Sequence, residues 1–393
     1  MQLSPRLQQL SPSATLVMTQ KARELKAEGH DVISLSIGEP DFDTPDFIKE
    51  AAKIAIDENY SHYTPVSGYP ELKEAIIRKF KRDNKLDYKP SQIVVSTGAK
   101  QSIYNVFQSI IGPNDEVLVP APYWVTYTDI IKLSGGNPII VETSVDTDFK
   151  VTREMLEESI TPNCKAIIFS SPNNPSGCVY SSEELHEIAK FAKAHDLIII
   201  SDEIYEHIIY QEKPVSIATF EEAYDRTVTI NGLSKAFAMT GWRIGYIGAP
   251  EWIAKACETL QGQVTSGTNS IAQRTAITAL DADLSKIQYM IDAFKKRRKL
   301  IMDWVKEIPD FQISEPQGAF YIFPNVSSTF GKTYNGSLIK NADDLALLIL
   351  EEAHVSTVSG SAFGNNNCLR ISYAASEETL NEAMRRIKTL LEQ

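Results

Sequence analysis

The chain has 393 residues, of which 43% are hydrophobic and 23% charged, and its formal net charge is −12. This composition is that of an ordinary globular protein, and the length is sufficient for two or three domains that each bury a core. The acidic balance argues against non-specific nucleic-acid binding and against binding to anionic membranes. The four cysteines form no Cys-x-x-Cys pair, which argues against zinc and thioredoxin-like chemistry.

The N-terminus lacks a basic segment followed by an apolar run, so the sequence predicts no secretory signal. No apolar run approaches the roughly 18 residues that a membrane-spanning helix needs. We therefore expect a soluble cytoplasmic protein with reduced cysteines and no membrane partner.

Short apolar runs alternate with longer amphipathic segments along the first two thirds of the chain. The apolar runs predict buried strands at residues 93–95, 116–119, 138–141, 166–169, 197–201 and 227–230, with a further strand at 245–248. Helical patterns lie between them at residues 101–111, 182–195 and 250–261. This alternation predicts the α/β class, with a mostly parallel sheet that helices cover on both faces.

The pattern changes after the last of these strands. Residues 281–307 predict one long helix, and its charge run Lys295, Lys296, Arg297 and Arg298 is typical of a solvated face. Apolar runs at 318–323 and 369–373 predict strands of a smaller α+β unit that ends in a helix at 377–391. The glycine- and asparagine-containing segment 330–336 predicts a mobile loop.

The most informative segment is residues 231–245, which follows a predicted strand. Lys235 lies among small residues such as Gly232 and Ser234, and Arg243 follows eight residues later. Small neighbours leave room for a flat group, a lysine amine can condense with an aldehyde, and an arginine can hold a phosphate. An aldehyde and a phosphate on one flat ring describe pyridoxal phosphate. The alternative is a solvated lysine in an ordinary loop.

Polar residues follow two other predicted strands at their carboxyl ends, where parallel sheets face a ligand crevice. Asp202 follows the strand at 197–201 and can pair with a protonated pyridine nitrogen, or it can cap a helix. Tyr205 can donate to the phenolic oxygen of the same ring. Asn174 lies in a turn that prolines and a glycine make rigid, and it can present its amide to that oxygen, although such turns are common.

Further residues indicate anion binding. The backbone around Gly98 and Ala99 lies at a predicted helix start, where N–H groups bind phosphate well. Lys100 in the first turn opposes the helix dipole, which favours a nearby anion, unless its side chain points into water. Arg370 lies in an apolar strand and needs either an anionic ligand or an internal ion pair. Trp124 follows the strand at 116–119 and can also be plain core packing.

Together these segments resemble the motifs of class-I, fold-type I pyridoxal-phosphate-dependent aminotransferases, in the family's order and over nearly the whole chain. The segment around Lys235 matches the family's lysine signature, and Asp202 and Tyr205 match its Asp-x-x-Tyr pair. Tyr63 begins the family's Tyr-x-x-x-x-Gly-x-Pro-Glu-Leu segment. The chain differs from the family's pattern at Gly232, where many relatives carry a serine that contacts the phosphate. The phosphate-binding site is therefore expected to differ here.

The resemblance implies a large α/β domain over residues 46–285, with a mostly parallel seven-stranded sheet, and a small α+β domain made of residues 1–45 and 286–393. It also implies that Lys235 is the catalytic residue and holds pyridoxal phosphate as a Schiff base. The implied cofactor-binding residues are Tyr63, Gly98, Ala99, Lys100, Trp124, Asn174, Asp202, Tyr205, Ser234, Lys235 and Arg243. The implied substrate-binding residues are Gly38, Lys100, Trp124, Asn174 and Arg370, with Arg370 on the α-carboxylate and Trp124 stacked on the cofactor ring.

In the family, the tyrosine that matches Tyr63 reaches the phosphate of the neighbouring subunit, which implies a homodimer with shared active sites. The chain is most similar to the bacterial aspartate aminotransferase subgroup, whose lysine at the position of Lys100 meets the distal substrate carboxylate. The other subgroup uses an arginine from the partner subunit, and residues 262–270 contain none. The resemblance thus implies amino-group transfer between aspartate and 2-oxoglutarate.

The sequence leaves other functions open. An aminotransferase that prefers aromatic, alanine-like or prephenate substrates, or a pyridoxal-dependent lyase, would share the fold. Ser11 stands where some prephenate-using relatives carry a basic residue, which argues against that substrate. A cofactor-binding regulator would need an additional basic DNA-binding domain. A nucleotide-binding α/β protein would carry Gly-x-Gly-x-x-Gly after its first strand, and the chain has none there.

Overall fold

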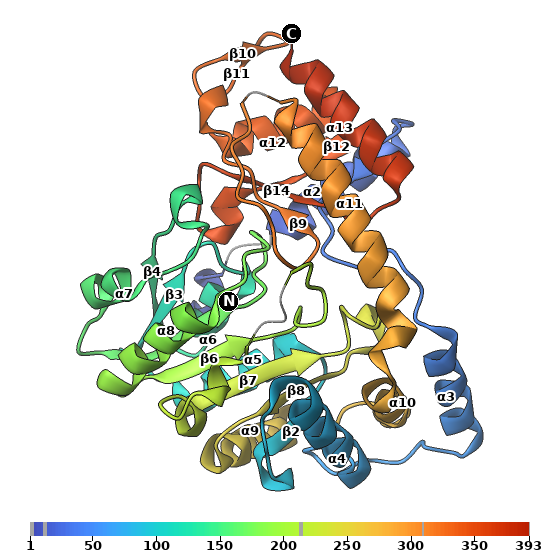
Figure 1. Ribbon diagram of the computed structural model, residues 1–393, viewed down its shortest axis with the longest axis vertical. Helices are drawn as coiled ribbons and strands as arrows, with labels where there is room; N and C mark the ends of the chain where they lie inside the picture. The colour runs from blue at the N-terminus through green and yellow to red at the C-terminus, as the bar shows by residue number, and fades with distance from the viewer. Residues whose placement is uncertain (1–3, 11–13, 212–214, 309, 393) are drawn as a thin grey trace.

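The computed structural model describes residues 4–10, 14–211, 215–308 and 310–392. Its central feature is a seven-stranded sheet in the order β2-β8-β7-β6-β5-β3-β4 (Figure 1). Its strands are β2 (Ile93–Ser96), β3 (Glu116–Pro120), β4 (Asn137–Val141), β5 (Cys164–Ser170), β6 (Ile198–Asp202), β7 (Thr227–Gly232) and β8 (Gly245–Gly248). Only β8 runs antiparallel to its neighbours within this sheet. The predicted α/β class and mostly parallel sheet are confirmed.

Helices cover both faces of this sheet because successive strand residues point to opposite sides. Val94, Ile168 and Ile200 pack against the helices of one face, which are α5 (Ala99–Ile110), α6 (Thr126–Leu133) and α9 (Glu251–Val264). Ile167 and Val95 point to the other face. That face is covered by α3 (Asp46–Asp57), α4 (Pro70–Lys79), α7 (Arg153–Ser159), α8 (Ser182–Ala194) and α10 (Ser270–Asp281).

The C-terminal part forms its own apolar core beside the large sheet. Its helices are α11 (Gln288–Lys306), α12 (Ala342–Glu352) and α13 (Glu377–Leu391), and α11 runs from the level of the large sheet up to the other two (Figure 1). Its strands are β9 (Tyr321–Ile322), β10 (Thr333–Tyr334), β11 (Ser337–Leu338), β12 (Val355–Ser356), β13 (Val358–Ser359) and β14 (Leu369–Ser372).

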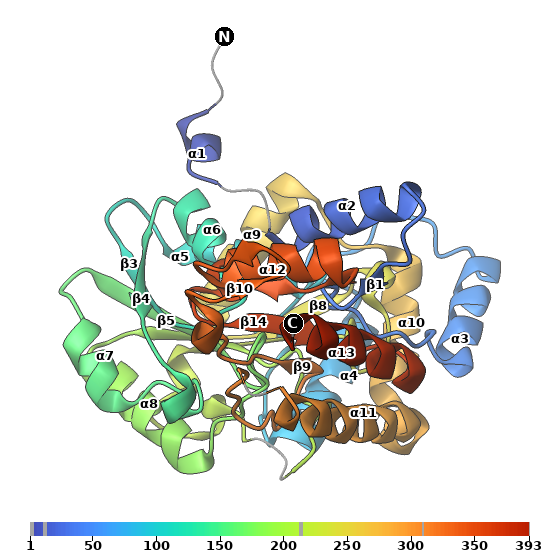
Figure 2. The same cartoon turned by 90° about the horizontal axis from the view of Figure 1, so that it is seen from above.

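The N-terminal segment packs on this C-terminal part. Strand β1 (Ile33–Ser34) pairs in parallel with β12, and Ala22 of α2 (Ala14–Ala27) packs with Leu350 of α12. Helix α1 (Pro5–Gln8) projects from the body of the molecule (Figure 2). The domain boundaries at residues 45 and 285 stay predictions. Within the part of the chain that the structure describes, no helix combines the length and apolar character that would let it cross a lipid bilayer.

Two predicted elements are wrong in detail. The long helix at 281–307 is interrupted, because α10 ends at Asp281 and Asp283 accepts a hydrogen bond from Ser285 N at 2.8 Å, which caps a separate turn before α11. The strand at 138–141 is not buried, because β4 is an edge strand and Ile140 is 36% exposed. Residues 333–336 belong to a hairpin of β10 and β11, and the mobility expected for residues 330–336 stays a prediction.

The predicted solvated face of α11 is correct for Lys295 and Lys296 and wrong for the next two residues. The Arg297 guanidinium is buried and donates to both oxygens of Asp41, at 2.7 and 2.9 Å. It also lies 4.9 Å from the ring centroid of Phe42. Arg298 donates to Pro316 O and pairs with Glu315. These partners are more than 15 residues away in sequence, and hence the charge run alone could not indicate them.

We expect Arg297→Ala to lower the free energy of unfolding by about 2 kcal/mol, less than the ~3–5 kcal/mol of a fully buried pair because Asp41 keeps some solvent contact. Urea denaturation followed by circular dichroism measures this loss. Lys296→Ala, on the exposed side of the same helix, is the matched control and should change stability by less than about 0.5 kcal/mol. Equal effects of the two substitutions would contradict the internal role of Arg297.

Candidate active site

A cavity of about 390 Å³ opens at the edge of the sheet where its parallel strands end. Strands β2, β3, β5, β6 and β7 all run towards this edge, and β8 starts there because it runs in the opposite direction. Eleven of the predicted site residues line the cavity: Gly38, Ala99, Lys100, Trp124, Asn174, Asp202, Tyr205, Ser234, Lys235, Arg243 and Arg370. The topology therefore gathers side chains that lie up to 332 positions apart in the sequence.

Lys235 follows β7 and points its amine into this cavity. Its Nζ donates to Gly38 O at 2.6 Å and lies 5.8 Å from the ring centroid of Tyr205. Burial lowers the pKa of Lys235 to about 8, and the cations of Arg370 and Arg243 also lower it, whereas Glu39 and Asp202 raise it. A lysine with this pKa has a large neutral fraction near pH 8, which makes it a nucleophile.

Asp202 ends β6 and is buried at the floor of the site. Its Oδ2 accepts a hydrogen bond from the hydroxyl of Tyr127 at 2.6 Å, and its Oδ1 accepts one from Ile204 N at 3.3 Å. Burial raises the pKa of Asp202, whereas these hydrogen bonds lower it. A carboxylate so placed has a strong preference for a cationic ligand group, because such a group would compensate its desolvation.

Arg370 of β14 is the most deeply buried cation of the cavity, with 2% of the residue exposed. Its guanidinium donates to Asn174 Oδ1 at 3.1 Å and to Ser36 O at 2.5 Å, and lies 4.7 Å from the ring centroid of Tyr321. Its Nε has no hydrogen-bond partner. Among the described residues no carboxylate forms an ion pair with it, so the internal ion pair is not observed and the site favours an anionic ligand.

Gly98 and Ala99 form the turn where β2 meets α5, and we call it the anion-binding turn because N–H groups at a helix start are suited to an anion. Gly98 has a φ of 85°, and a Cβ there would lie 2.3 Å from an Arg243 nitrogen, so that only glycine lets this guanidinium approach the backbone. Arg243 donates to Thr240 O at 2.7 Å. Lys100 lies in the first turn of α5 with its amine 4.9 Å from the Trp124 ring centroid. Desolvation lowers the pKa of Lys100, and Arg243 adds to this effect.

Two predicted residues lie outside the cavity lining. Gly98 lies behind Arg243, and Tyr63 is 99% exposed on the surface. Ser11, which bears on the prephenate alternative, lies outside the described residues. Two tyrosines of the site are not expected from the sequence: Tyr127 and Tyr321, whose hydroxyls contact Asp202 and Tyr205 at 2.6 and 2.8 Å. Spacing alone does not indicate these two, because Tyr127 lies in an ordinary helical segment between two threonines and Tyr321 lies in an apolar run.

Comparisons with known proteins give matches over nearly the whole chain. The sequence model for aminotransferase class I and II matches residues 30–387. The chain is 45% identical to an aspartate aminotransferase of Geobacillus stearothermophilus over 100% of this chain and 99% of the relative. It is 46% identical to a probable aspartate/prephenate aminotransferase of Aquifex aeolicus over 100% and 99%.

Solved structures are similar over the same length. The structure of an aspartate aminotransferase from Rhizobium meliloti superposes with a TM-score of 0.97 at 39% identity, covering 100% of this chain and 99% of the other. An aspartate aminotransferase of Thermus thermophilus with maleate gives a TM-score of 0.94 at 38% identity, covering 99% and 100%.

The low pKa of Lys235 can be measured in the protein free of small molecules. We expect labelling of Lys235 by an amine-directed reagent to rise with pH around a midpoint of about 8, because the amine loses its proton there. Peptide mapping by mass spectrometry across pH 6–11 gives this profile, with peptides from exposed lysines as the internal reference. A midpoint near the ordinary lysine value of about 10.4 would contradict the desolvation of this amine.

Proposed function

The chain belongs to the aminotransferase class I and II family, and from this premise we propose that it transfers the amino group of aspartate to 2-oxoglutarate with pyridoxal phosphate as cofactor. The observation that carries this proposal is that one cavity holds the desolvated Lys235 together with Arg370 and Lys100, neither of which forms a salt bridge with a carboxylate among the described residues. A dicarboxylic amino acid would neutralise both cations at once.

The residues present fit pyridoxal phosphate. The unpartnered Nε of Arg370 indicates that an anion belongs in the cavity. The anion-binding turn is also shaped by close packing, since a Cβ at Gly245 would lie 2.2 Å from Ala99 N. Asp202 offers a buried anion to a ring cation, whereas Arg243 offers a cation to a phosphate in the same cavity.

We assign the contacts as follows. Lys235 would hold the aldehyde carbon, Asp202 the ring nitrogen, and Tyr205 and Asn174 the phenolic oxygen. Trp124 would cover the ring face, and the phosphate would lie against the backbone of Gly98 and Ala99 with Ser234 and Arg243. When bound, the cofactor supplies an aldehyde that carries the amino group and a ring that withdraws electrons from the substrate α-carbon.

The chain's own residues bind and orient the substrate and move its proton. Arg370 holds the α-carboxylate by paired hydrogen bonds, and Lys100 holds the distal carboxylate. The amine of Lys235 would be released when the substrate amine takes its place on the aldehyde carbon. Neutral in a large fraction at about pH 8, it would then remove the proton from the substrate α-carbon. Gly38 and its neighbours close over the substrate and exclude water, and the hydrogen bond from Lys235 Nζ to Gly38 O already joins these two segments.

We further propose that the enzyme is a homodimer with shared sites. Tyr63 is 99% exposed and contributes nothing to the cavity of its own chain, although it belongs to a motif whose tyrosine reaches the partner's phosphate in related enzymes. A tyrosine so exposed is readily explained if a second copy covers it, because aromatic residues are enriched in interfaces. Each site would then be complete only with the partner's Tyr63.

Borohydride reduction tests the assignment of Lys235. We expect the purified protein with added pyridoxal phosphate to show visible absorbance that borohydride abolishes, and peptide mapping to find the reduced cofactor on Lys235. Lys235→Ala should lose both the absorbance and the label, whereas Lys165→Ala, an exposed surface control, should keep them. Label elsewhere, or full turnover by Lys235→Ala, would refute the proposed function.

The role of Lys100 is tested by comparing substrates. We expect Lys100→Ala to lower kcat/KM for aspartate by about 30-fold, which corresponds to ~2 kcal/mol for a lost charge-assisted hydrogen bond, and for alanine by less than about threefold. Steady-state kinetics with 2-oxoglutarate as acceptor measure both values. Equal losses for the two substrates would contradict a distal-carboxylate role. The same substrate panel includes prephenate, aromatic acids and alanine. An aspartate aminotransferase and a probable aspartate/prephenate aminotransferase are 45% and 46% identical to this chain, so the names of the relatives do not decide between these substrates.

A further inference from the structure

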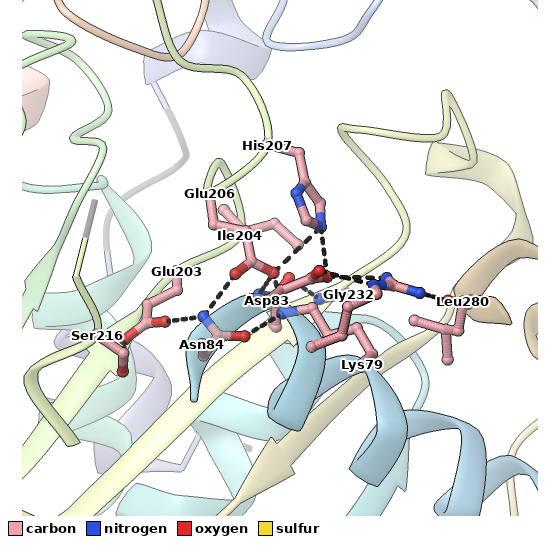
Figure 3. Close-up of polar contacts among 12 residues, drawn as sticks. Lys79, Asp83, Asn84, Glu203, Ile204, Glu206, His207, Ser216, Gly232 and Leu280 are labelled. Atoms are coloured by element: carbon pink, nitrogen blue, oxygen red, sulfur yellow. Dashed lines mark hydrogen bonds and ion pairs between the residues drawn. The ribbon is translucent and has the colours of Figure 1, made fainter. Parts of the chain in front are cut away.

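A network of buried polar side chains lies behind the loops that carry the proposed cofactor contacts (Figure 3). We call it the loop-support network, and it consists of Lys79, Asp83, Asn84, Glu203, Glu206, His207 and Asn231. None of these residues lines the cavity. Burying charged groups costs free energy unless they are paired and hydrogen-bonded, and an apolar cluster of similar volume is often as stable. The network therefore calls for an explanation beyond stability.

Glu206 is its centre. Its Oε1 accepts a hydrogen bond from Asn231 Nδ2 at 2.5 Å and pairs with Lys79 Nζ, and its Oε2 accepts one from Asn84 Nδ2 at 2.7 Å. Lys79 also donates to Asn84 Oδ1 at 2.7 Å. The Asn84 amide reaches Glu203 Oε2 at 3.2 Å as well, so that one asparagine spans both glutamates. Lys79 and Glu206 thus form a balanced buried ion pair.

The network residues lie next to the cavity residues in the sequence. Asp202 and Tyr205 face the cavity, whereas the residue after each of them, Glu203 and Glu206, is buried on the other side. Asn231 lies near the end of β7, four positions before Lys235. The hydrogen bond between Glu206 and Asn231 therefore ties the segment that presents Asp202 and Tyr205 to the strand that presents Lys235.

Further polar residues surround the hydrogen bond between Glu206 and Asn231. Asn84 ends a π-helical turn (Phe80–Asn84) that continues α4, and such turns often occur at functional sites. Asp83 and Glu206 lie 3.5 Å from His207 Nε2, and Arg82 pairs with Asp83. Although burial opposes it, Lys79 and His207 lower the pKa of Glu206, and hence Glu206 is the charged acceptor at the centre of the network.

We propose that the loop-support network is a positioning device that fixes Asp202 and Tyr205 relative to Lys235 through the link between Glu206 and Asn231. This inference rests on the proposed function, because it concerns the same cofactor contacts. A network that served only the stability of the fold would, when broken, lower the unfolding temperature and leave the environment of the bound cofactor unchanged. A positioning network would change that environment.

The experiment uses the full-length protein with pyridoxal phosphate and two variants. Asn231→Ala removes the link itself. The double variant Lys79→Met with Glu206→Leu removes the central ion pair without leaving a buried charge unpaired, so it should fold even where a single charge deletion would not. Thr229→Val is the matched control, since Thr229 lies on the same strand and makes a buried side-chain hydrogen bond, to the Tyr88 hydroxyl at 3.0 Å, that involves no member of the network.

Three measurements are made on each protein: the unfolding temperature without cofactor, the dissociation constant of pyridoxal phosphate, and the pH midpoint of the visible absorbance. We expect both network variants to bind the cofactor at least about tenfold more weakly and to shift the pH midpoint by about 0.5 unit or more. Thr229→Val should lower only the unfolding temperature.

Network variants whose cofactor affinity and absorbance midpoint match those of Thr229→Val would overturn the inference and leave a structural role. This result differs from failure of the proposed function, in which the unaltered protein itself would show no cofactor absorbance. If Asn231→Ala does not fold, the double variant decides between the two roles, and Asn231→Ser provides a milder break of the same link.

Discussion

The site depends on one cation, Arg370, that the fold keeps out of water without an ion pair among the described residues. Arg370 is 2% exposed and has an unpartnered Nε, and its charge contributes to the low pKa of Lys235. Such an arrangement costs stability in the ligand-free protein. The cost is offset when an anion enters, because a carboxylate would then pair with Arg370 in a medium of low dielectric. The fold thus holds a preference for carboxylates before any substrate arrives.

The sheet topology makes this arrangement possible. Because parallel strands end at one edge, β6 and β7 deliver Asp202 and Lys235 to the same cavity, and the reversed strand β8 brings Arg243 to it from the other direction. Arg370 comes instead from the C-terminal part of the chain. A movement between the two parts would change the distance from Arg370 to Lys235, and the bond from Lys235 to Gly38 O would be sensitive to it.

Much of the large sheet and of the cavity lining could be predicted from the sequence, because strand-end polar residues such as Asp202 and the lysine segment are local signals. What could not be predicted depends on distant partners. Arg297 follows two lysines that are exposed, yet it is buried because Asp41, 256 positions away, lies against α11. Tyr127, which lies in helix α6, donates a hydrogen bond to Asp202 at the end of strand β6. In the sequence, Glu203 and Glu206 resemble ordinary surface acids. Only the fold shows that Lys79 pairs with Glu206 and that Asn84 donates to both glutamates.

The departure at Gly232 follows from packing on both sides of β7. Gly232 is paired with Gly245 of β8, and a Cβ at Gly232 would lie 2.8 Å from Ile244 O and 3.1 Å from Ile204 Cδ1. A serine there would require β8 to move away, and Gly245 already lies against Ala99 of the anion-binding turn. Strand β7 is fixed by its pairing with β8 and by the hydrogen bond from Asn231 to Glu206, and hence the chain has no space for this hydroxyl. The phosphate contacts would therefore fall to Ser234, Arg243 and the backbone at the start of α5.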